Sequence, residues 1–163
     1  MTYTGLHPIV LPGFRPDFRI RRAAVRGGFD IFDLVRRKWV ALTPEEWVRQ
    51  NLTAYFVAVK GVPLSRISCE TSIVYNGLSR RCDAIIYDGY ANPVAILEFK
   101  AQGVRITQSV FDQIAVYNMR LNVPYLIVSN GITHICCRVS LSSGVAPVFL
   151  PGLPDYAQMT GVR

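Results

Sequence analysis

Apolar and polar residues follow a strand pattern in two neighbouring stretches, residues 80–87 and 94–100. Both stretches are rich in Ile, Val, Leu and Tyr, and turn residues bound them. The segment that joins them, residues 88–93, contains Asp, Gly, Asn and Pro, a composition typical of a turn. The pattern therefore predicts a β-hairpin in the middle of the chain.

Two carboxylates meet if this hairpin turns between Tyr90 and Ala91, because Asp83 then lies directly opposite Glu98. Like charges that face each other across a strand pair are unfavourable, and their burial is costly without a compensating cation or proton. Lys100, two residues after Glu98, is one candidate for that cation. A divalent metal ion is the other, because proteins typically hold Mg²⁺ with one or two carboxylates, water and substrate phosphate.

Helical signals mark two further segments. Thr43 suits the N-cap of the first helix, Pro44 its first position, and Glu46 completes a capping box. We expect this helix to run to about Val59, and a second helix over residues 107–121.

Other apolar stretches predict the rest of a sheet. Strands are expected at residues 68–75, 124–129 and 132–139, with a strand or hairpin arm within 29–42. The run at 124–129 follows a helix, which suits a buried parallel strand. Together the elements predict an α/β fold with a central mixed sheet of four to five strands flanked by helices.

The length of 163 residues suits one domain. We expect an extended, basic N-terminal arm rich in Pro and Gly over 1–28, the folded domain over 29–140 and an irregular C-terminal tail over 141–163. No apolar run reaches the roughly 18 residues of a membrane span, and no secretory signal is visible. Four cysteines without metal-binding spacing fit reduced thiols and a cytoplasmic location.

The acidic pair and Lys100 resemble the active site of the PD-(D/E)xK nuclease superfamily, with Asp83 followed by Glu98-Phe99-Lys100 on the adjacent strand. Cys82 stands where the motif usually has Pro. Three other segments resemble the N-terminal nuclease domain of type I restriction enzyme R subunits, in its small stand-alone bacterial form. These segments are residues 38–50, 112–118 and 124–131. The resemblance covers about residues 30–140 and implies a restriction-endonuclease-like core.

The resemblance implies roles for the central residues. Asp83 and Glu98 would hold Mg²⁺ or Mn²⁺, with the carbonyl of Phe99 as a third protein oxygen. Lys100 would orient or deprotonate the attacking water, or neutralise the phosphate. Glu45, near the apolar stripe of the first helix, would complete the metal site; a surface or capping carboxylate is the competing interpretation.

Two residues of the second helix match a signature of the superfamily, Gln-x-x-x-Tyr. Gln113 and Tyr117 are four residues apart and therefore adjacent on a helix surface. The resemblance implies that both line the catalytic site; otherwise Tyr117 is a core residue and Gln113 an edge polar group. Glu70 is either a further site acid or a cross-strand partner of Arg80 or Arg81.

The net charge of +7 fits an anionic partner. Residues 1–40 hold eight Lys or Arg against three Asp. From this cluster we expect five residues to contact nucleic-acid phosphates: Arg21, Arg22, Arg36, Arg37 and Lys38. A solvated, solubilising surface is the alternative.

The resulting hypothesis is a metal-dependent nuclease that hydrolyses phosphodiester bonds in nucleic acid, with a link to restriction or defence. DNA is the substrate favoured in this hypothesis, and an RNA-directed nuclease is the weaker alternative. The chain has no P-loop motif, so a motor or specificity subunit would be a separate partner. Cutting both strands of a duplex needs two sites, which makes a homodimer one option. The alternative is a catalytically idle nuclease-fold module that binds DNA or protein.

Overall fold

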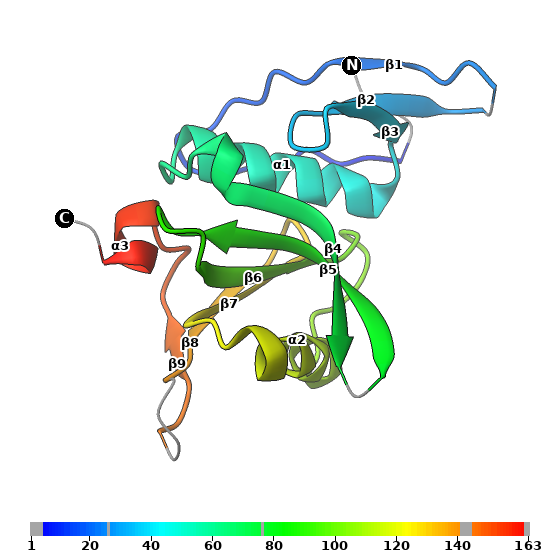
Figure 1. The fold of residues 1–163 in the computed structure, drawn as a ribbon. Coiled ribbons are helices and arrows are strands. Elements are labelled where there is room, and N and C mark those ends of the chain that lie inside the picture. The colour runs from blue at the N-terminus through cyan, green and yellow to red at the C-terminus, as the bar shows by residue number, and fades with distance from the viewer. Residues whose placement is uncertain (1–4, 26, 76, 141–144, 162–163) are drawn as a thin grey trace.

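The computed structural model describes residues 5–25, 27–75, 77–140 and 145–161, which form two β-sheets and three α-helices (Figure 1). The smaller sheet is antiparallel, in the order β1-β2-β3. Its strands are β1 (Ile20–Arg22), β2 (Phe29–Asp33) and β3 (Lys38–Ala41). Ile31 in the middle of β2 is fully buried, so one face of this sheet packs on the rest of the molecule.

The larger sheet has six strands in the order β4-β5-β6-β7-β8-β9. The strands are β4 (Ile67–Tyr75), β5 (Leu78–Tyr87), β6 (Pro93–Phe99), β7 (Tyr125–Ser129), β8 (His134–Arg138) and β9 (Val148–Leu150). β6 and β7 are parallel and every other pair is antiparallel. The α/β class and the mixed sheet are therefore confirmed, whereas the predicted count of four to five strands is one too low.

Helices cover both faces of the larger sheet. α1 (Pro44–Ala58) lies between the two sheets, and α2 (Gln108–Leu121) lies on the opposite face of the six-stranded sheet (Figure 1). The core is split accordingly, with Phe56 and Leu97 in the cluster beneath α1 and Ile96 and Ile114 in the cluster beneath α2. A 3₁₀ turn (Leu64–Arg66) leads from α1 into β4. No helix in the described part of the chain is long and apolar enough to cross a membrane.

The hairpin of β5 and β6 has the register predicted from its turn. Ala84 pairs with Leu97 and Ile85 with Ile96, so the next step along the strands brings Asp83 beside Glu98. The Asp88 carboxylate stabilises the turn by accepting hydrogen bonds from the backbone amides of Tyr90 and Asn92, both at 2.8 Å. The register shifts between Ile86 and Tyr87, so the polar turn and this bulge together determine where the two carboxylates meet.

Both ends of the chain contain more structure than the sequence predicted. The expected irregular tail includes β9, which pairs with β8, and a short helix, α3 (Tyr156–Thr160), whose Met159 is buried in the core. A capping box between Asp155 and Gln158 starts this helix. At the other end, β1 joins the small sheet, and Ile9 and Leu11 are buried although their segment has no regular structure. Such elements are too short for hydrophobic periodicity to reveal.

Candidate active site

The central carboxylates lie side by side, Asp83 in the middle of β5 where its pairing with β6 ends, and Glu98 near the end of β6. Asp83 on β5 accepts a hydrogen bond through Oδ2 from the backbone N–H of Phe99, at 2.7 Å. Glu98 on β6 is only 2% exposed. Its Oε1 accepts hydrogen bonds from Lys100 Nζ and Gln113 Nε2, both at 2.7 Å. Its Oε2 is buried and has no hydrogen-bond partner among the described residues.

Helix α2 supplies the support for this pair. Besides its bond to Glu98, Gln113 Nε2 lies 3.2 Å from the hydroxyl of Tyr117. That hydroxyl donates a hydrogen bond of 2.9 Å to the backbone carbonyl of Arg81, two residues before Asp83. Gln113 and Tyr117 therefore link α2 to both strands at the acidic pair, and Tyr117 is also a buried residue of the α2-side core.

The site is short of positive charge. Burial raises the pKa of Glu98 to about 7, and the neighbouring charge of Asp83 adds to the effect. Burial also raises the pKa of Asp83, although the Phe99 N–H opposes the shift. Lys100 keeps its proton, because its hydrogen bond to Glu98 raises its pKa despite the opposing effect of burial. Lys100 thus lies beside two buried carboxylates whose negative charges repel each other. A further cation would stabilise both carboxylates.

Glu45 of α1 lies close to the pair without joining it. It lines a pocket of about 290 Å³ together with Asp83 and Phe99, and its charge contributes to the raised pKa of Asp83. However, no three His, Cys, Asp or Glu side chains in the described part of the chain are close enough to hold a metal ion together. The role of Glu45 as a further metal ligand stays a prediction.

Comparisons with known proteins identify the family of this chain. The sequence profile described as type I restriction enzyme R protein N terminus (HSDR_N) matches residues 44–154, which is more than half of the chain. The chain belongs to this family. A solved fragment assigned to an HsdR subunit of a type I restriction enzyme from Vibrio vulnificus YJ016 has 22% identity and a TM-score of 0.36. The similarity covers 55% of this chain and 17% of that fragment. No curated protein matches the chain.

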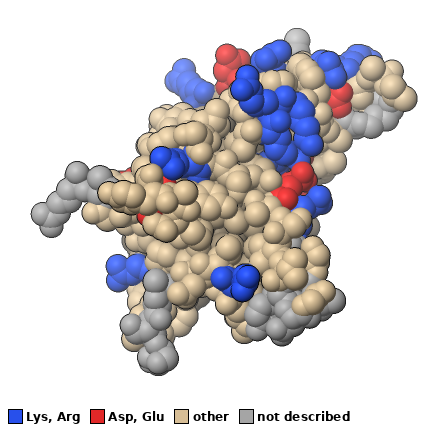
Figure 2. All heavy atoms as spheres, viewed as in Figure 1, with Lys and Arg blue, Asp and Glu red and all other residues tan. Residues whose placement is uncertain are grey.

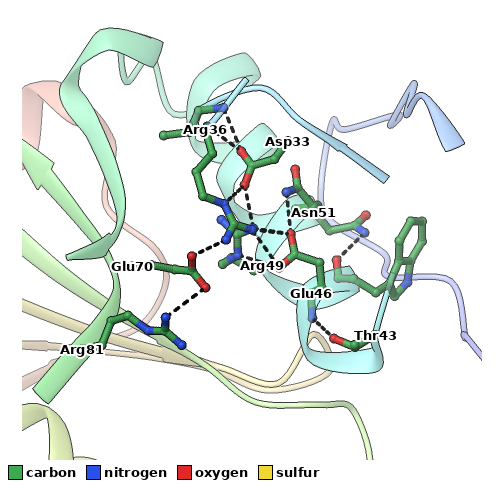
Figure 3. Close-up of polar contacts among 11 residues, drawn as sticks. Asp33, Arg36, Thr43, Glu46, Arg49, Asn51, Glu70 and Arg81 are labelled. Atoms are coloured by element: carbon green, nitrogen blue, oxygen red, sulfur yellow. Dashed lines mark hydrogen bonds and ion pairs between the residues drawn. The ribbon is translucent and has the colours of Figure 1, made fainter. Parts of the chain in front are cut away.

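The HSDR_N match begins with α1, and the residues before it add a network that the sequence did not reveal. Asp33 of β2, only 1% exposed, accepts hydrogen bonds from Arg36 and from Arg49 of α1, the latter at 2.7 Å. Glu46 accepts from the same two arginines and from Gln50 (Figure 3). Burial alone would raise the pKa of Asp33. The hydrogen bonds from Arg36 and Arg49 outweigh burial and lower this pKa to about 2. The network joins the small sheet to the family domain.

This network bears on two sequence-based assignments. The contact of Arg36 with nucleic acid stays a prediction, and in the structure its guanidinium is largely buried and bonded to Asp33, Glu46 and Glu70. Glu46 was expected to complete a capping box, but its carboxylate bonds the arginines, and Thr43 caps the helix by accepting from the Glu46 N–H. Helical spacing accounts for the bond between Glu46 and Arg49, which are three residues apart on α1. The bonds of Asp33 to Arg49 and of Arg36 to Glu70 join separate elements and have no signal in the sequence.

The other basic residues of the predicted nucleic-acid surface are exposed. They are Arg21, Arg22, Arg37 and Lys38. Figure 2 shows Lys and Arg side chains gathered over the region of the small sheet. Arg21 stacks over the ring of Trp39 at 4.1 Å and lies 3.5 Å from Asp30. Glu70 pairs with Arg81 at 3.8 Å, as the cross-strand interpretation expected, and also with Arg36.

The raised pKa of Glu98 makes stability depend on pH. The pKa is about 7 in the folded protein and 4.5 ordinarily, so the unfolded chain loses this proton first as the pH rises. The contribution of Glu98 to stability is therefore complete below pH 4.5 and is lost as the pH rises through about 7.

We expect the melting temperature in EDTA to fall between about pH 5 and about pH 8 by more in the wild type than in Glu98→Gln. His134, whose burial lowers its pKa, acts in the opposite sense but is present in both proteins, so the difference reports the titration of the Glu98–Asp83 pair. Equal pH dependence in the two proteins would contradict the assignment. Differential scanning fluorimetry provides the measurement.

Proposed function

We propose that this chain is a metal-dependent nuclease of the PD-(D/E)xK type, which hydrolyses phosphodiester bonds in nucleic acid, with DNA as its substrate. The observation that carries the proposal is the buried, unpartnered Oε2 of Glu98 beside Asp83. An uncompensated buried carboxylate oxygen is costly, and such features concentrate at functional sites. Membership of a restriction-enzyme family supports the same function.

The residues present fit Mg²⁺ or Mn²⁺. Both ions prefer oxygen ligands, and the site offers carboxylate oxygens of Asp83 and Glu98 with the carbonyl of Phe99 on the same strand. Among these, Glu98 Oε2 has no other described partner. A bound divalent cation supplies positive charge for the phosphate in the transition state and lowers the pKa of water.

The chain's own residues would position and neutralise the reacting groups. Lys100 keeps its proton beside Glu98, which suits orientation of water and neutralisation of phosphate better than removal of a proton. Gln113 fixes the orientation of Glu98, and Tyr117 fixes the backbone of Arg81 next to Asp83. These bonds hold the carboxylates before substrate binds, as efficient catalysis requires.

The proposed setting is restriction or defence, with a motor or specificity subunit as a proposed partner. The predicted homodimer receives no support from the structure or the comparisons. A second candidate is a catalytically idle module, which the 2.7 Å contact between Lys100 and Glu98 also allows, because a structural ion pair would have the same geometry.

Substitution of Lys100 separates the two candidates. We expect Lys100→Gln to lower the rate of plasmid cleavage in Mg²⁺ by about 100-fold or more, because a charge that acts on the transition state is removed. Binding of Mn²⁺ is expected to persist, since both carboxylates remain. The measurement is agarose-gel cleavage of supercoiled DNA, with EDTA and an RNA transcript as parallel conditions.

Lys60→Gln is the matched control, because it removes the same positive charge as Lys100→Gln. Lys60 lies outside the site, with its Nζ over the ring of Tyr55 at 5.8 Å. Full activity of Lys100→Gln would remove Lys100 from the mechanism. Absence of cleavage by the wild type under all of these conditions would favour the idle module.

A further inference from the structure

A strained residue stands at the rim of the pocket beside Asp83. Glu70 on β4 has a backbone φ of 55°, in the left-handed region that residues other than glycine rarely adopt. Such conformations persist where the surrounding structure imposes them, and they concentrate at functional sites. On either side of Glu70, β4 pairs with β5 in the same register: Cys69 pairs with Ala84, and Thr71 pairs with Cys82. The left-handed conformation is therefore confined to Glu70 and leaves the pairing of β4 with β5 unchanged around it.

The Glu70 carboxylate lies between two arginines from different elements. Its Oε2 is 2.5 Å from Arg36 Nη1, and its Oε1 is 3.8 Å from Arg81 Nη1 (Figure 3). Burial acts to raise the pKa of Glu70, but the hydrogen bond from Arg36 outweighs burial and lowers this pKa. The Glu70 carboxylate is therefore charged. An anion held by two guanidinium groups has the arrangement that a phosphate group would adopt there.

The neighbouring buried charges are balanced without the Glu70 carboxylate. Asp33 and Glu46 together balance Arg36 and Arg49, so these four groups are neutral without it. The side chain of Arg81 is 65% exposed and that of Glu70 35% exposed, so both can move into solvent. Arg36, in contrast, is fixed by its other two partners.

The same pocket contains the proposed catalytic carboxylate. Its lining includes Arg36, Glu70 and Arg81 together with Asp83 and Phe99. Arg81 is two residues from Asp83 on β5, and the hydrogen bond from Tyr117 to its carbonyl fixes the backbone at that point. An anion between the arginines would therefore lie in the same pocket as Asp83.

We propose that the Glu70 carboxylate occupies a phosphate-binding position formed by Arg36 and Arg81, and that a backbone phosphate of the nucleic-acid substrate displaces it. Glu70 is thus a built-in competitor that weakens binding of nucleic acid, and Arg81 is a positioning residue for a phosphate near the scissile bond. The inference rests on the proposed function, from which it takes nucleic acid as the ligand. It concerns the binding of nucleic acid rather than its cleavage.

Binding without catalysis provides the test. The dissociation constant of a short fluorescein-labelled DNA duplex is measured by fluorescence anisotropy in EDTA, at low salt and over a salt series. We expect Glu70→Gln to bind about fivefold more tightly than the wild type, and Arg81→Gln about fivefold more weakly. The Arg81→Gln variant should also lower the slope of log Kd against log salt by about 1.

Two further variants make the result specific. Asp17→Asn changes the net charge by the same amount as Glu70→Gln, at an exposed residue outside the pocket, and should leave Kd unchanged. In the Arg81→Gln background, Glu70→Gln should improve binding about twofold or less, because one of the two freed arginines is missing.

The proposal is overturned if Glu70→Gln does not tighten binding, if Asp17→Asn tightens it equally, or if neither the wild type nor Glu70→Gln binds the duplex at low salt. Circular dichroism spectra confirm that each variant is folded. Failure of the nuclease proposal appears separately, as absence of cleavage in Mg²⁺ by a protein that still binds DNA with the expected ranking.

Discussion

Asp83→Asn should abolish cleavage while the protein stays folded. Loss of one carboxylate charge from the proposed metal site removes several kcal/mol of transition-state stabilisation, which corresponds to a rate at least about 1000-fold lower. The fold should persist because an asparagine carbonyl can accept the bond that the Phe99 N–H now donates to Asp83. Stability should be equal or higher, since the substitution relieves repulsion that raises the pKa of Glu98.

The measurements are DNA cleavage in Mg²⁺ and urea unfolding followed by circular dichroism. Asp112→Asn is the control, because Asp112 is exposed on α2 and accepts a hydrogen bond from Gln108, one turn earlier on the same helix. Cleavage by Asp83→Asn at the wild-type rate would exclude a catalytic role. Marked unfolding of Asp83→Asn would identify the acidic pair as part of a structural network instead.

Arg49→Met should cause the largest loss of stability. Arg49 is buried against Asp33 and Glu46, and its removal leaves two largely buried carboxylates with Arg36 as their shared cation. Breaking a buried ion pair by removing one partner typically costs about 3–5 kcal/mol. The sheet of β1–β3 should separate from α1 more readily as a result, because Asp33 is its buried link to that helix.

Urea unfolding gives the free energy directly, and Arg105→Met is the matched control. Arg105 is exposed in the loop before α2, so its substitution should change the free energy of unfolding by about 0.5 kcal/mol or less. Arg49→Lys should fall between the wild type and Arg49→Met, because lysine keeps the charge without the planar fork. A loss below about 1 kcal/mol for Arg49→Met would mean that the network does not hold the sheet.

The acidic pair was predictable because its geometry depends on local sequence. The turn at Asp88, with the bulge between Ile86 and Tyr87, sets the register of β5 and β6 that places Asp83 beside Glu98. Helical spacing likewise places Gln113 next to Tyr117, and the resemblance to known nucleases indicated which side of α2 faces the site. In each case the contact follows from a short element or from one recognised motif.

The network of Asp33, Arg36, Glu46 and Arg49 was not predictable in this way. Its members belong to a hairpin and a helix whose relative position is determined by tertiary packing, and a charged residue in a sequence is more often exposed than buried. The carboxylates that bind Arg36 were therefore not visible in the sequence. The positive φ of Glu70 is equally invisible, because glutamate carries no sequence signal for that conformation.

Titration with Mn²⁺ by isothermal calorimetry tests the central claim most directly, with wild type, Asp83→Asn and Glu98→Gln compared at a pH above the raised pKa of Glu98. The account predicts one site in the wild type and affinity at least about 10-fold weaker in each variant, because each loses a ligand charge. Absence of binding in the wild type with and without a bound DNA duplex, or equal affinity in all three proteins, would contradict a metal site at Asp83 and Glu98.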